Sequence, residues 1–346
     1  MRQRPAESLR IAQIAPVGCA VRPGIGESVE QLVSLLCEEL VARGHRVTLF
    51  ATGDSQTSAE LRWYFKRGYE FDELLWDWQF TEYMHVGHAY AQADKFDVIH
   101  CHSYHFGLPF VQFVSTPSVH THHVHVEPGV LAAYSRLEGV RVVAVSEHHA
   151  TAYGDRANVE LIPHGIDTGA FPFGARSGDY LLFLGRMIQD KGPLQAIEIA
   201  RQAQTPLVLA GPAEDGFEQR VAPLVDGERV RYVGRVEAPQ RDRLLAGAAA
   251  LVYPLQYPEP FGLVPIEAMA CGTPVLGVGI GAVPELVEPG VTGYLADSWE
   301  ELPGLVPRAL ALDRRTIRAR ARERFDYSKM VDRHEALYRR VAKARA

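Results

Sequence analysis

The sequence is poor in cysteine and contains no long apolar run. Four of its 346 residues are cysteines, and none of them forms a Cys-x-x-Cys pair: Cys19, Cys37, Cys101 and Cys271. Their apolar or small neighbours predict reduced, buried thiols, the default in a cytosolic protein. No window reaches the ~18 uninterrupted apolar residues of a membrane span, and residues 1–5 lack the apolar segment of a signal peptide. We therefore expect a cytoplasmic protein, with peripheral membrane contact left open.

Positive charge is not in excess either. The formal net charge is −6, which argues against a nucleic-acid partner. Residues 308–345 are locally basic, and such a run is first of all a solvated helix face. The hydrophobic content of 47% and the charged content of 23% are ordinary for a soluble globular protein. The length predicts two domains, each with its own core, and leaves the oligomeric state open.

The first fifty residues have the pattern that opens a parallel α/β domain. An apolar run at 9–15 is followed by a loop with Gly24 and Gly26, a helical pattern at 27–43 and a second apolar run at 45–51. Strand, glycine loop, helix and strand in this order aim helix amides at a ligand crevice. The loop is not a dinucleotide fingerprint, because Gly24-x-Gly26 lacks the third glycine. A turn that binds nothing is the alternative.

The stretch 253–279 carries two glutamates eight positions apart, Glu259 and Glu267. Pro258 and Pro260 bracket the first of them and bias its neighbourhood away from helical angles, which predicts a rigid, extended loop around Glu259. Two glutamates at this spacing also arise by chance, and two solvated carboxylates are the simpler interpretation of the pair alone.

A helix is expected after that loop. Pro265 suits its first position, and Gly272 suits a left-handed cap at its end. Glu267 would then lie in the first turn, with the amides of residues 261–263 just ahead of it, where an anion is favoured. One carboxylate on the loop and one on the helix could both bind hydroxyls of a single phosphate-bearing ligand, such as a nucleotide-sugar.

Two cations follow another apolar run. Residues 180–184 predict a buried strand, and Arg186 and Lys191 come after its carboxyl end, where open parallel sheets bind ligands. Arg186 could hold a diphosphate with its forked guanidinium, and Lys191 could bind the same group as a point charge. A surface salt bridge is the alternative for either cation taken alone.

Together these strings resemble the family 4 retaining glycosyltransferases. The resemblance rests on Glu-x7-Glu at 259–267 with Phe-Gly-Leu inside it, on Ala-Met-Ala-Cys-Gly-Thr-Pro-Val after it and on Gly-Arg…Lys-Gly at 185–192. It implies an α/β protein of the GT-B fold, with two Rossmann-like doubly wound domains facing across a cleft. Residues 1–168 would form the acceptor-side domain together with a crossing helix at 327–346, and residues 169–326 the donor domain.

The resemblance also implies roles for individual residues. Family members often carry His-Thr-x-His after a strand, and its last histidine matches His123, which would contact the donor sugar. The family's Gly-Gly loop is replaced here by Pro23-Gly24, and His164 stands where asparagine is common. The predicted catalytic residues are His123, Arg186, Lys191 and Glu259. The predicted donor-binding residues are Gly24, Gly26, Arg186, Lys191, Gly211, Val236, Glu259, Phe261, Gly262, Leu263 and Glu267.

The implied reaction moves a hexose from a UDP- or GDP-hexose, such as UDP-glucose or GDP-mannose, to a hydroxyl of a glycan, a glycolipid or a small molecule, with retention. Many transferases neutralise the leaving diphosphate with a cation on Asp-x-Asp, a motif that is absent here, so we expect no essential metal or cofactor. Arg186, Lys191 and the amides near Gly262 would supply the counter-charge. A nucleotide-sugar 2-epimerase of the same fold and a non-catalytic nucleotide-sugar-binding protein are the alternatives.

Other features are less specific. The histidines at 100–125 suggest a metal site, but strand alternation sends His120 and His122 to one face and His123 to the other, which disfavours zinc. Residues 56–93 are rich in tryptophan and tyrosine, and we expect half of these rings in the core and the rest at an acceptor cleft. Residues 170–179 are expected to form the linker between the domains, and 307–325 a single helix.

Overall fold

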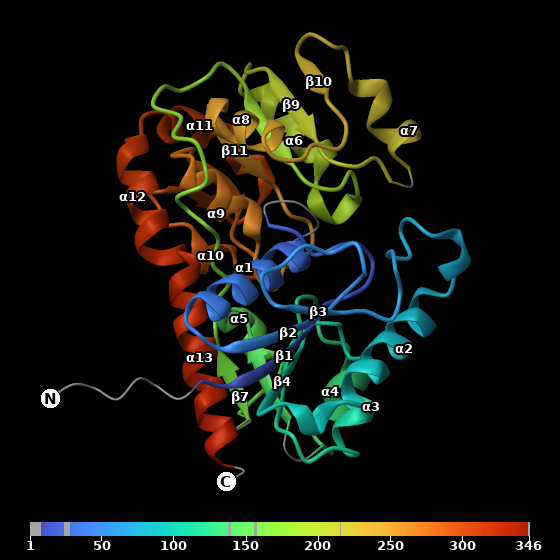
Figure 1. Cartoon of the computed structure of the whole chain (residues 1–346). Coiled ribbons are helices and arrows are strands. Elements are labelled where there is room, and N and C mark those ends of the chain that lie inside the picture. Colours follow the sequence, from blue (N-terminus) through green and yellow to red (C-terminus); the bar gives the residue numbers. More distant parts are fainter. Residues whose placement is uncertain (1–7, 24–27, 138–139, 156–157, 215, 345–346) are drawn as a thin grey trace, which may run out of the picture. The chain divides into compact units, whose positions relative to one another are not determined.

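The computed structural model describes residues 8–23, 28–137, 140–155, 158–214 and 216–344. The chain divides into two compact units, coloured along the chain in Figure 1: unit 1 comprises Met1–Gly165 and Tyr327–Ala346, and unit 2 comprises Ile166–Asp326. The boundary thus falls three residues before the one predicted after residue 168. The expected linker belongs to unit 2, where the Gly174 N–H donates to the Cys271 carbonyl at 2.9 Å.

In the described part of unit 1, seven parallel strands form one sheet in the order β3-β2-β1-β4-β5-β6-β7. The strands are β1 (Arg10–Ile14), β2 (Arg46–Phe50), β3 (Glu60–Arg62), β4 (Val98–Cys101), β5 (Ser118–Thr121), β6 (Val140–Ala144) and β7 (Val159–Leu161). The helices are α1 (Ser28–Ala42), α2 (Trp78–Tyr90), α3 (Leu108–Val111), α4 (Pro128–Tyr134), α5 (Glu147–Thr151) and α13 (Tyr327–Lys343). The strand order reverses between β1 and β4, which places the ligand crevice of such a sheet at the carboxyl ends of these strands.

Local sequence explains where the elements of unit 1 begin. Asp77 caps α2 by accepting from the Phe80 N–H, and Ser146 accepts from the His149 N–H at the start of α5. Strands β4 and β5 are buried along their whole length, as expected for a parallel sheet covered on both faces. Helix α13 packs on α1 and β4, so the end of the chain completes the core of unit 1.

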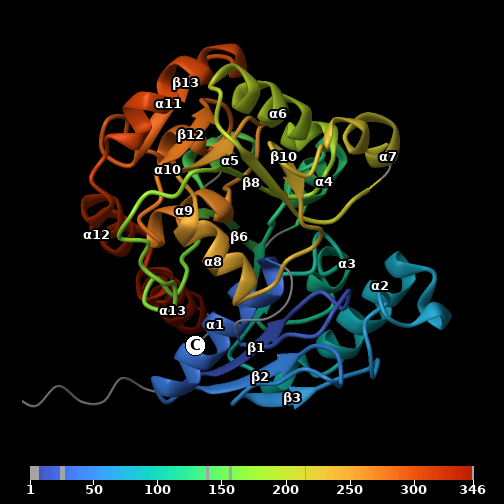
Figure 2. The same ribbon diagram turned by 90° about the horizontal axis from the view of Figure 1, so that it is seen from above.

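In the described part of unit 2, six parallel strands run in the order β10-β9-β8-β11-β12-β13. They are β8 (Leu181–Leu184), β9 (Leu207–Ala210), β10 (Val230–Tyr232), β11 (Ala250–Tyr253), β12 (Val275–Val278) and β13 (Gly293–Ala296). The helices are α6 (Pro193–Gln202), α7 (Phe217–Arg220), α8 (Gln240–Gly247), α9 (Leu263–Ala270), α10 (Val283–Leu286), α11 (Leu302–Leu310) and α12 (Arg314–Phe325). Helices α6 and α11 pack together, and α9 packs with α8 and α12 (Figure 2). The order reverses between β8 and β11, whose carboxyl ends are therefore the expected ligand edge.

Two predictions from the sequence need correction. The single helix expected at 307–325 is two helices, because Asp313 caps α12 by accepting from the N–H groups of Arg315 and Thr316, while Pro307 lies inside α11. The aromatic rings at 56–93 are not half buried. Those singled out in the sequence are each more than a third exposed: Trp63, Tyr64, Trp76, Trp78 and Tyr83.

All 14 histidines of the chain fall in unit 1, and burial lowers the pKa of many of them. Burial takes the pKa to about 3 for His120 and His164 and to about 4 for His85 and His334. These side chains are neutral in the folded protein near pH 5, whereas the same histidines in the unfolded chain bind protons below about pH 6.5. They therefore contribute stability that is present above pH 6.5 and is lost as the pH falls towards their folded pKa values.

We expect the stability of unit 1 to fall steeply between pH 6.5 and pH 4.5, by about 1.4 kcal/mol per pH unit for each such histidine. Hydrogen exchange followed by mass spectrometry, corrected for the intrinsic rate at each pH, measures the two units separately. Unit 2 has no histidine and is the internal control. Replacement of His334 by Asn should reduce the pH dependence by about one proton, and equal loss of protection in both units would contradict this explanation.

Candidate functional site

The carboxyl end of β8 leads into a tight connection that carries Lys191. A 3-10 helix at Gln189–Lys191 ends at Gly192, which has a φ of 78°, and Pro193 then begins α6. A side chain at Gly192 would bring its Cβ to 2.2 Å from the carbonyl oxygen of Pro254. Only glycine permits this close approach, which brings Lys191 next to the segment that follows β11.

Lys191 and Glu259 form an ion pair there. Their side chains are 25% and 16% exposed, so the pair is shielded from water on most sides. The phenol of Tyr253, the last residue of β11, donates a hydrogen bond to the second carboxylate oxygen of Glu259. One carboxylate therefore bridges an ammonium and a buried phenol.

The loop that carries Glu259 is held from its other side by Gly281. The Ala282 N–H donates to the Glu259 carbonyl at 3.1 Å, and a Cβ at Gly281 would lie 2.6 Å from the Glu259 nitrogen. Gly281 has a φ of 61°. The backbone of Glu259 is thus fixed by close packing as well as by its flanking prolines.

Arg186 lies at the same edge of the sheet but is more exposed. Its side chain is 56% exposed, and its guanidinium lies 3.6 Å from the carboxylate of Glu214. Burial, and then the positive charge of Arg186, lower the pKa of Lys191 to about 8. Two cations near each other at a ligand edge are costly unless an anion joins them, and a diphosphate is an anion of suitable charge.

Helix α9 starts earlier than the sequence predicted. Gly262, with a φ of 108°, is its N-cap and Leu263 its first residue, so Pro265 occupies the third position, where no intrahelical N–H bond is needed. Glu267 is consequently in the second turn, not the first. The prediction of a left-handed residue after the helix is confirmed, because Gly272 has a φ of 81°.

Glu267 is buried at 7% exposure and faces an arginine. The nearest atoms of Arg241, on α8, and Glu267 are 3.5 Å apart, and Arg241 also donates to Asp242 at 2.9 Å. Burial raises the pKa of Glu267, and Arg241 opposes the rise. Sequence reasoning missed Arg241, because nothing in the mixed charges of residues 240–247 marks it. It also missed Tyr253, whose place at a strand's carboxyl end was an available signal.

Gly211 and Val236, both predicted to bind the donor, follow the neighbouring strands β9 and β10. The Gly211 N–H donates to the Gly234 carbonyl at 2.8 Å, and a Cβ at Gly211 would lie 1.9 Å from the oxygen of Gly185. Val236 follows two residues after Gly234 and is half-buried. Gly211 is therefore in direct contact with the residue that precedes Arg186.

Three of the residues predicted to form the site belong to unit 1: Gly24, Gly26 and His123. Gly24 and Gly26 lie outside the described residues. His123 follows the carboxyl end of β5, and both of its ring nitrogens have partners: Nε2 is 3.1 Å from Nδ1 of His102, and Nδ1 is 3.3 Å from Nε2 of His164. Sequence reasoning did not connect His102 with His123, although strand neighbours β4 and β5 place their carboxyl ends side by side.

The other histidines after β4 and β5 do not form a metal site. The His120 ring is 3.1 Å from the Tyr90 phenol, and the His122 ring is 2.9 Å from the Tyr134 phenol. Among the residues that the structure describes, no three His, Cys, Asp or Glu side chains converge as a metal-ligand set. The rings of His120 and His122 are each hydrogen-bonded to a buried tyrosine.

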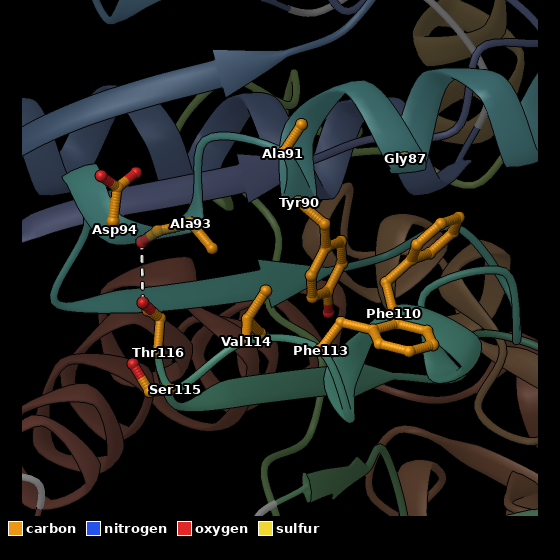
Figure 3. Close-up of a pocket in the computed structure, with 10 residues that line it drawn as sticks. All are labelled: Gly87, Tyr90, Ala91, Ala93, Asp94, Phe110, Phe113, Val114, Ser115 and Thr116. Carbon is orange, nitrogen blue, oxygen red and sulfur yellow. Dashed lines mark hydrogen bonds between the residues drawn. The ribbon is translucent and has the colours of Figure 1, made fainter.

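A cavity of about 520 Å³ in unit 1 is lined by none of the predicted site residues. Figure 3 shows Tyr90 and Phe110 on its wall, and the hydroxyl of Thr116 donating to the Ala93 carbonyl at 2.7 Å. Thr116 precedes β5, whereas His123 follows it. The cavity is thus at the amino end of that strand, opposite the ligand edge of the sheet.

The fold and the residues at the carboxyl edge of the unit 2 sheet indicate the class of protein. Two separate parallel sheets with helices are the architecture of GT-B glycosyltransferases, and the paired cations and carboxylates of unit 2 lie at the switch point of its sheet, where such sheets bind ligands. Solved proteins support the fold: sucrose-phosphate synthase from Thermosynechococcus elongatus has a TM-score of 0.79 at 22% identity, covering 97% of this chain and 100% of that one.

The sequence comparisons then define the family. The model described as "Glycosyltransferase Family 4" matches residues 29–170, and the model described as "Glycosyl transferases group 1" matches residues 174–324. The chain belongs to glycosyltransferase family 4, and with it to the sugar-transferring enzymes.

Individual relatives are more distant. A D-inositol 3-phosphate glycosyltransferase from Frankia alni is 29% identical over 342 residues, which cover 79% of this chain and 83% of that protein. Other curated relatives match this chain over about half of their own length. A structure of Anabaena HepE in complex with UDP and glucose has a TM-score of 0.72 at 20% identity, covering 95% of this chain and 99% of that one. No helix in the described part of the chain has the length and hydropathy needed to cross a membrane.

Proposed function

We propose that this chain transfers a hexose from a UDP- or GDP-hexose to an acceptor hydroxyl, with retention at the anomeric carbon and without an essential metal. The observation that supports this most is the contact of Lys191 with Glu259 beside Arg186, at the carboxyl ends of β8 and β11. It combines a cationic group for the diphosphate with an acceptor of hydroxyl hydrogen bonds for the sugar, on two loops held by glycine contacts.

Donor binding would exchange partners within this site. The diphosphate would take the place of Glu259 beside Lys191, and the carboxylate would become available to accept from sugar hydroxyls while Tyr253 holds its other oxygen. Charge-assisted hydrogen bonds of this kind are about twice as strong as neutral ones. As the bond to the sugar breaks, negative charge grows on the diphosphate, and the two fixed cations and the N-terminus of α9 would stabilise it.

Glu267 would bind the ribose hydroxyls. It is buried one helical turn beyond the N-terminus of α9, and Arg241 holds its position and favours its charged form. Gly211 and Val236 would lie against the base. The Anabaena protein was solved with UDP and glucose, so UDP is the first nucleotide to test.

The test is a panel of nucleoside diphosphates and their hexoses, UDP-glucose and GDP-mannose included, measured first by thermal shift and then by transfer to acceptor hydroxyls. We expect one nucleoside diphosphate to raise the melting temperature and its hexose to be transferred with retention, as read by NMR of the product's anomeric proton. Incubation of the donor alone should leave the hexose unchanged. A changed hexose without acceptor indicates an epimerase, and stabilisation without turnover for any acceptor indicates a binding protein.

Activity should survive EDTA. Lys191 and Arg186 would carry the counter-charge that a bound cation supplies elsewhere, so prior treatment with EDTA is expected to leave the initial rate within about twofold of the untreated rate. Addition of Mg²⁺ or Mn²⁺ to the treated enzyme is the control. A rate that disappears with EDTA and returns with either ion would contradict the metal-independent mechanism.

A further inference from the structure

A continuous hydrogen-bonded chain runs through the core of unit 1 and includes His123. It begins on β5 and β4, passes through α13 and β1, and continues through the segments that follow β4, β5 and β7. In order, its members are Thr121, His100, Tyr338, Gln13, His102, His123 and His164. All are buried except His123, which is half-buried.

The amide of Gln13 determines which group donates in the neighbouring hydrogen bonds of this chain. Its Nε2 donates to the Tyr338 phenol at 3.0 Å, and its Oε1 accepts from Nε2 of His102 at 2.9 Å. Since an amide oxygen can only accept, His102 carries its proton on Nε2. The phenol already accepts from Gln13, so its own hydrogen goes to Nδ1 of His100, 2.6 Å away.

The proton position on His102 then determines the proton position on His123. Burial lowers the pKa of both His102 and His123 well below the usual range, so each ring is neutral and holds one proton. With its proton on Nε2, His102 can only accept at Nδ1, so the hydrogen of the 3.1 Å bond belongs to Nε2 of His123. Nδ1 of His123 is left as an acceptor.

In the structure Nδ1 of His123 accepts from Nε2 of His164 at 3.3 Å, a length beyond the usual range for a strong bond. This is the weakest link along the His102–His123–His164 part of the chain, and a hydroxyl group could replace it. The bond from His123 to His102 is shorter, at 3.1 Å. The ring would therefore keep the same proton position if its outer partner changed.

We propose that Gln13 and His102, supported by Tyr338, are positioning residues that hold His123 in its Nε2–H tautomer, so that its Nδ1 accepts a hydrogen bond from a substrate hydroxyl at the carboxyl edge of the unit 1 sheet. The role of the substrate hydroxyl rests on the proposed function, whereas the tautomer does not. In this tautomer His123 can accept a hydrogen bond from a hydroxyl at Nδ1. Its single N–H, on Nε2, is already donated to His102. Tyr338, on α13, contributes through its hydrogen bonds to Gln13 and His100.

The tautomer is tested directly by long-range ¹H–¹⁵N NMR on protein with ¹⁵N-labelled histidine, with the His123 signals identified by their loss in His123→Ala. We expect the Nε2–H pattern in the unmodified chain. His102→Leu removes the acceptor and should give a mixture of tautomers, whereas His102→Asn keeps an acceptor oxygen near the Nδ1 position and should restore the Nε2–H form. An Nδ1–H or doubly protonated His123 in the unmodified chain would overturn the inference.

Turnover separates positioning from folding. We expect His102→Leu to lower kcat at least tenfold with the KM for the donor within about threefold, and His102→Asn to recover most of the loss. Tyr338→Phe removes only one hydroxyl, and a mixed tautomer with lower kcat is expected there too. Tyr90→Phe is the matched control, because it removes a buried phenol bonded to His120, outside this chain, and should change neither readout.

The outcomes distinguish this inference from the proposed function. If no donor is transferred by the unmodified chain, the proposed function fails, and the NMR measurement still decides the tautomer. If the donor is transferred but His102→Leu and Tyr338→Phe keep full kcat while the tautomer changes, the role assigned to these residues is wrong. A His102→Leu variant that fails to fold leaves the decision to Tyr338→Phe.

Discussion

A Lys191→Met variant should lose nucleoside diphosphate affinity by about 100-fold or more. The substitution removes the half-buried ammonium and leaves the carboxylate of Glu259 without its counter-charge, next to the place proposed for the phosphates. Removal of one partner of a buried charge pair costs about 2–5 kcal/mol in comparable sites, and each 1.4 kcal/mol is a tenfold change in Kd. Isothermal titration with UDP and GDP measures the effect.

A second substitution makes the test specific. In the Lys191→Met/Glu259→Gln variant the repulsive carboxylate is gone, so the double variant should bind the diphosphate about tenfold more tightly than Lys191→Met alone, within the range of coupling between contacting residues. Arg201→Met is the matched control, because Arg201 is an exposed cation of the same unit paired only with Glu198 among the described contacts. If the double variant binds no better than the single one, the two side chains do not share the phosphate site.

The second large effect concerns Glu267. The unmodified chain should bind a nucleoside diphosphate about 10- to 100-fold more tightly than its 2′,3′-dideoxy analogue, because hydrogen bonds from ribose hydroxyls to a charged group contribute about 1.5–3 kcal/mol. Glu267→Gln should weaken binding of the ordinary nucleotide and leave the analogue nearly unaffected. The ratio of the two affinities falls towards one, a change that a general loss of stability would not produce.

Glu300→Gln is the control for this experiment, since that glutamate is exposed and lies in the 3-10 helix Trp299–Glu301 that follows β13. Arg241→Leu should act in the same direction as Glu267→Gln, because it removes the positive charge that opposes the raised pKa of Glu267. Its nucleotide affinity should therefore improve as the pH rises and the carboxyl group ionises. Unchanged affinity of Glu267→Gln for both nucleotides would contradict the ribose assignment.

Much of the architecture could be predicted from the apolar runs and from the glycine, proline and capping residues between them. The apolar runs at 45–51 and 180–184 contain β2 and β8, because a strand buried on both faces has to be apolar throughout. Gly272 follows the end of a helix in a left-handed conformation as predicted, since capping depends on the residue itself and on its immediate neighbours. The start of α9 was misplaced because Gly262 is a cap that the more obvious Pro265 concealed.

Exposure was harder to predict than secondary structure. The aromatic residues at 56–93 resemble core residues in composition, yet Trp63, Trp76 and Trp78 are 50%, 84% and 41% exposed. Whether a ring is buried depends on what other segments cover it, and that information is not local. The same limit applies to Arg241, which is an ordinary helical arginine in the sequence and a partner of Glu267 in the fold.

By itself, the sequence determined the α/β class, the parallel sheets, the family and the order in which glycines, cations and carboxylates follow the strands, because all of these depend on residue type and spacing along the chain. The tertiary structure alone decided which of those groups touch. It joined Lys191 to Glu259 and Tyr253, and it linked Gln13 to Tyr338 across 325 positions. Hydrogen bonds and ion pairs require atoms within about 3–4 Å, and only folding brings residues so distant in the chain to that range.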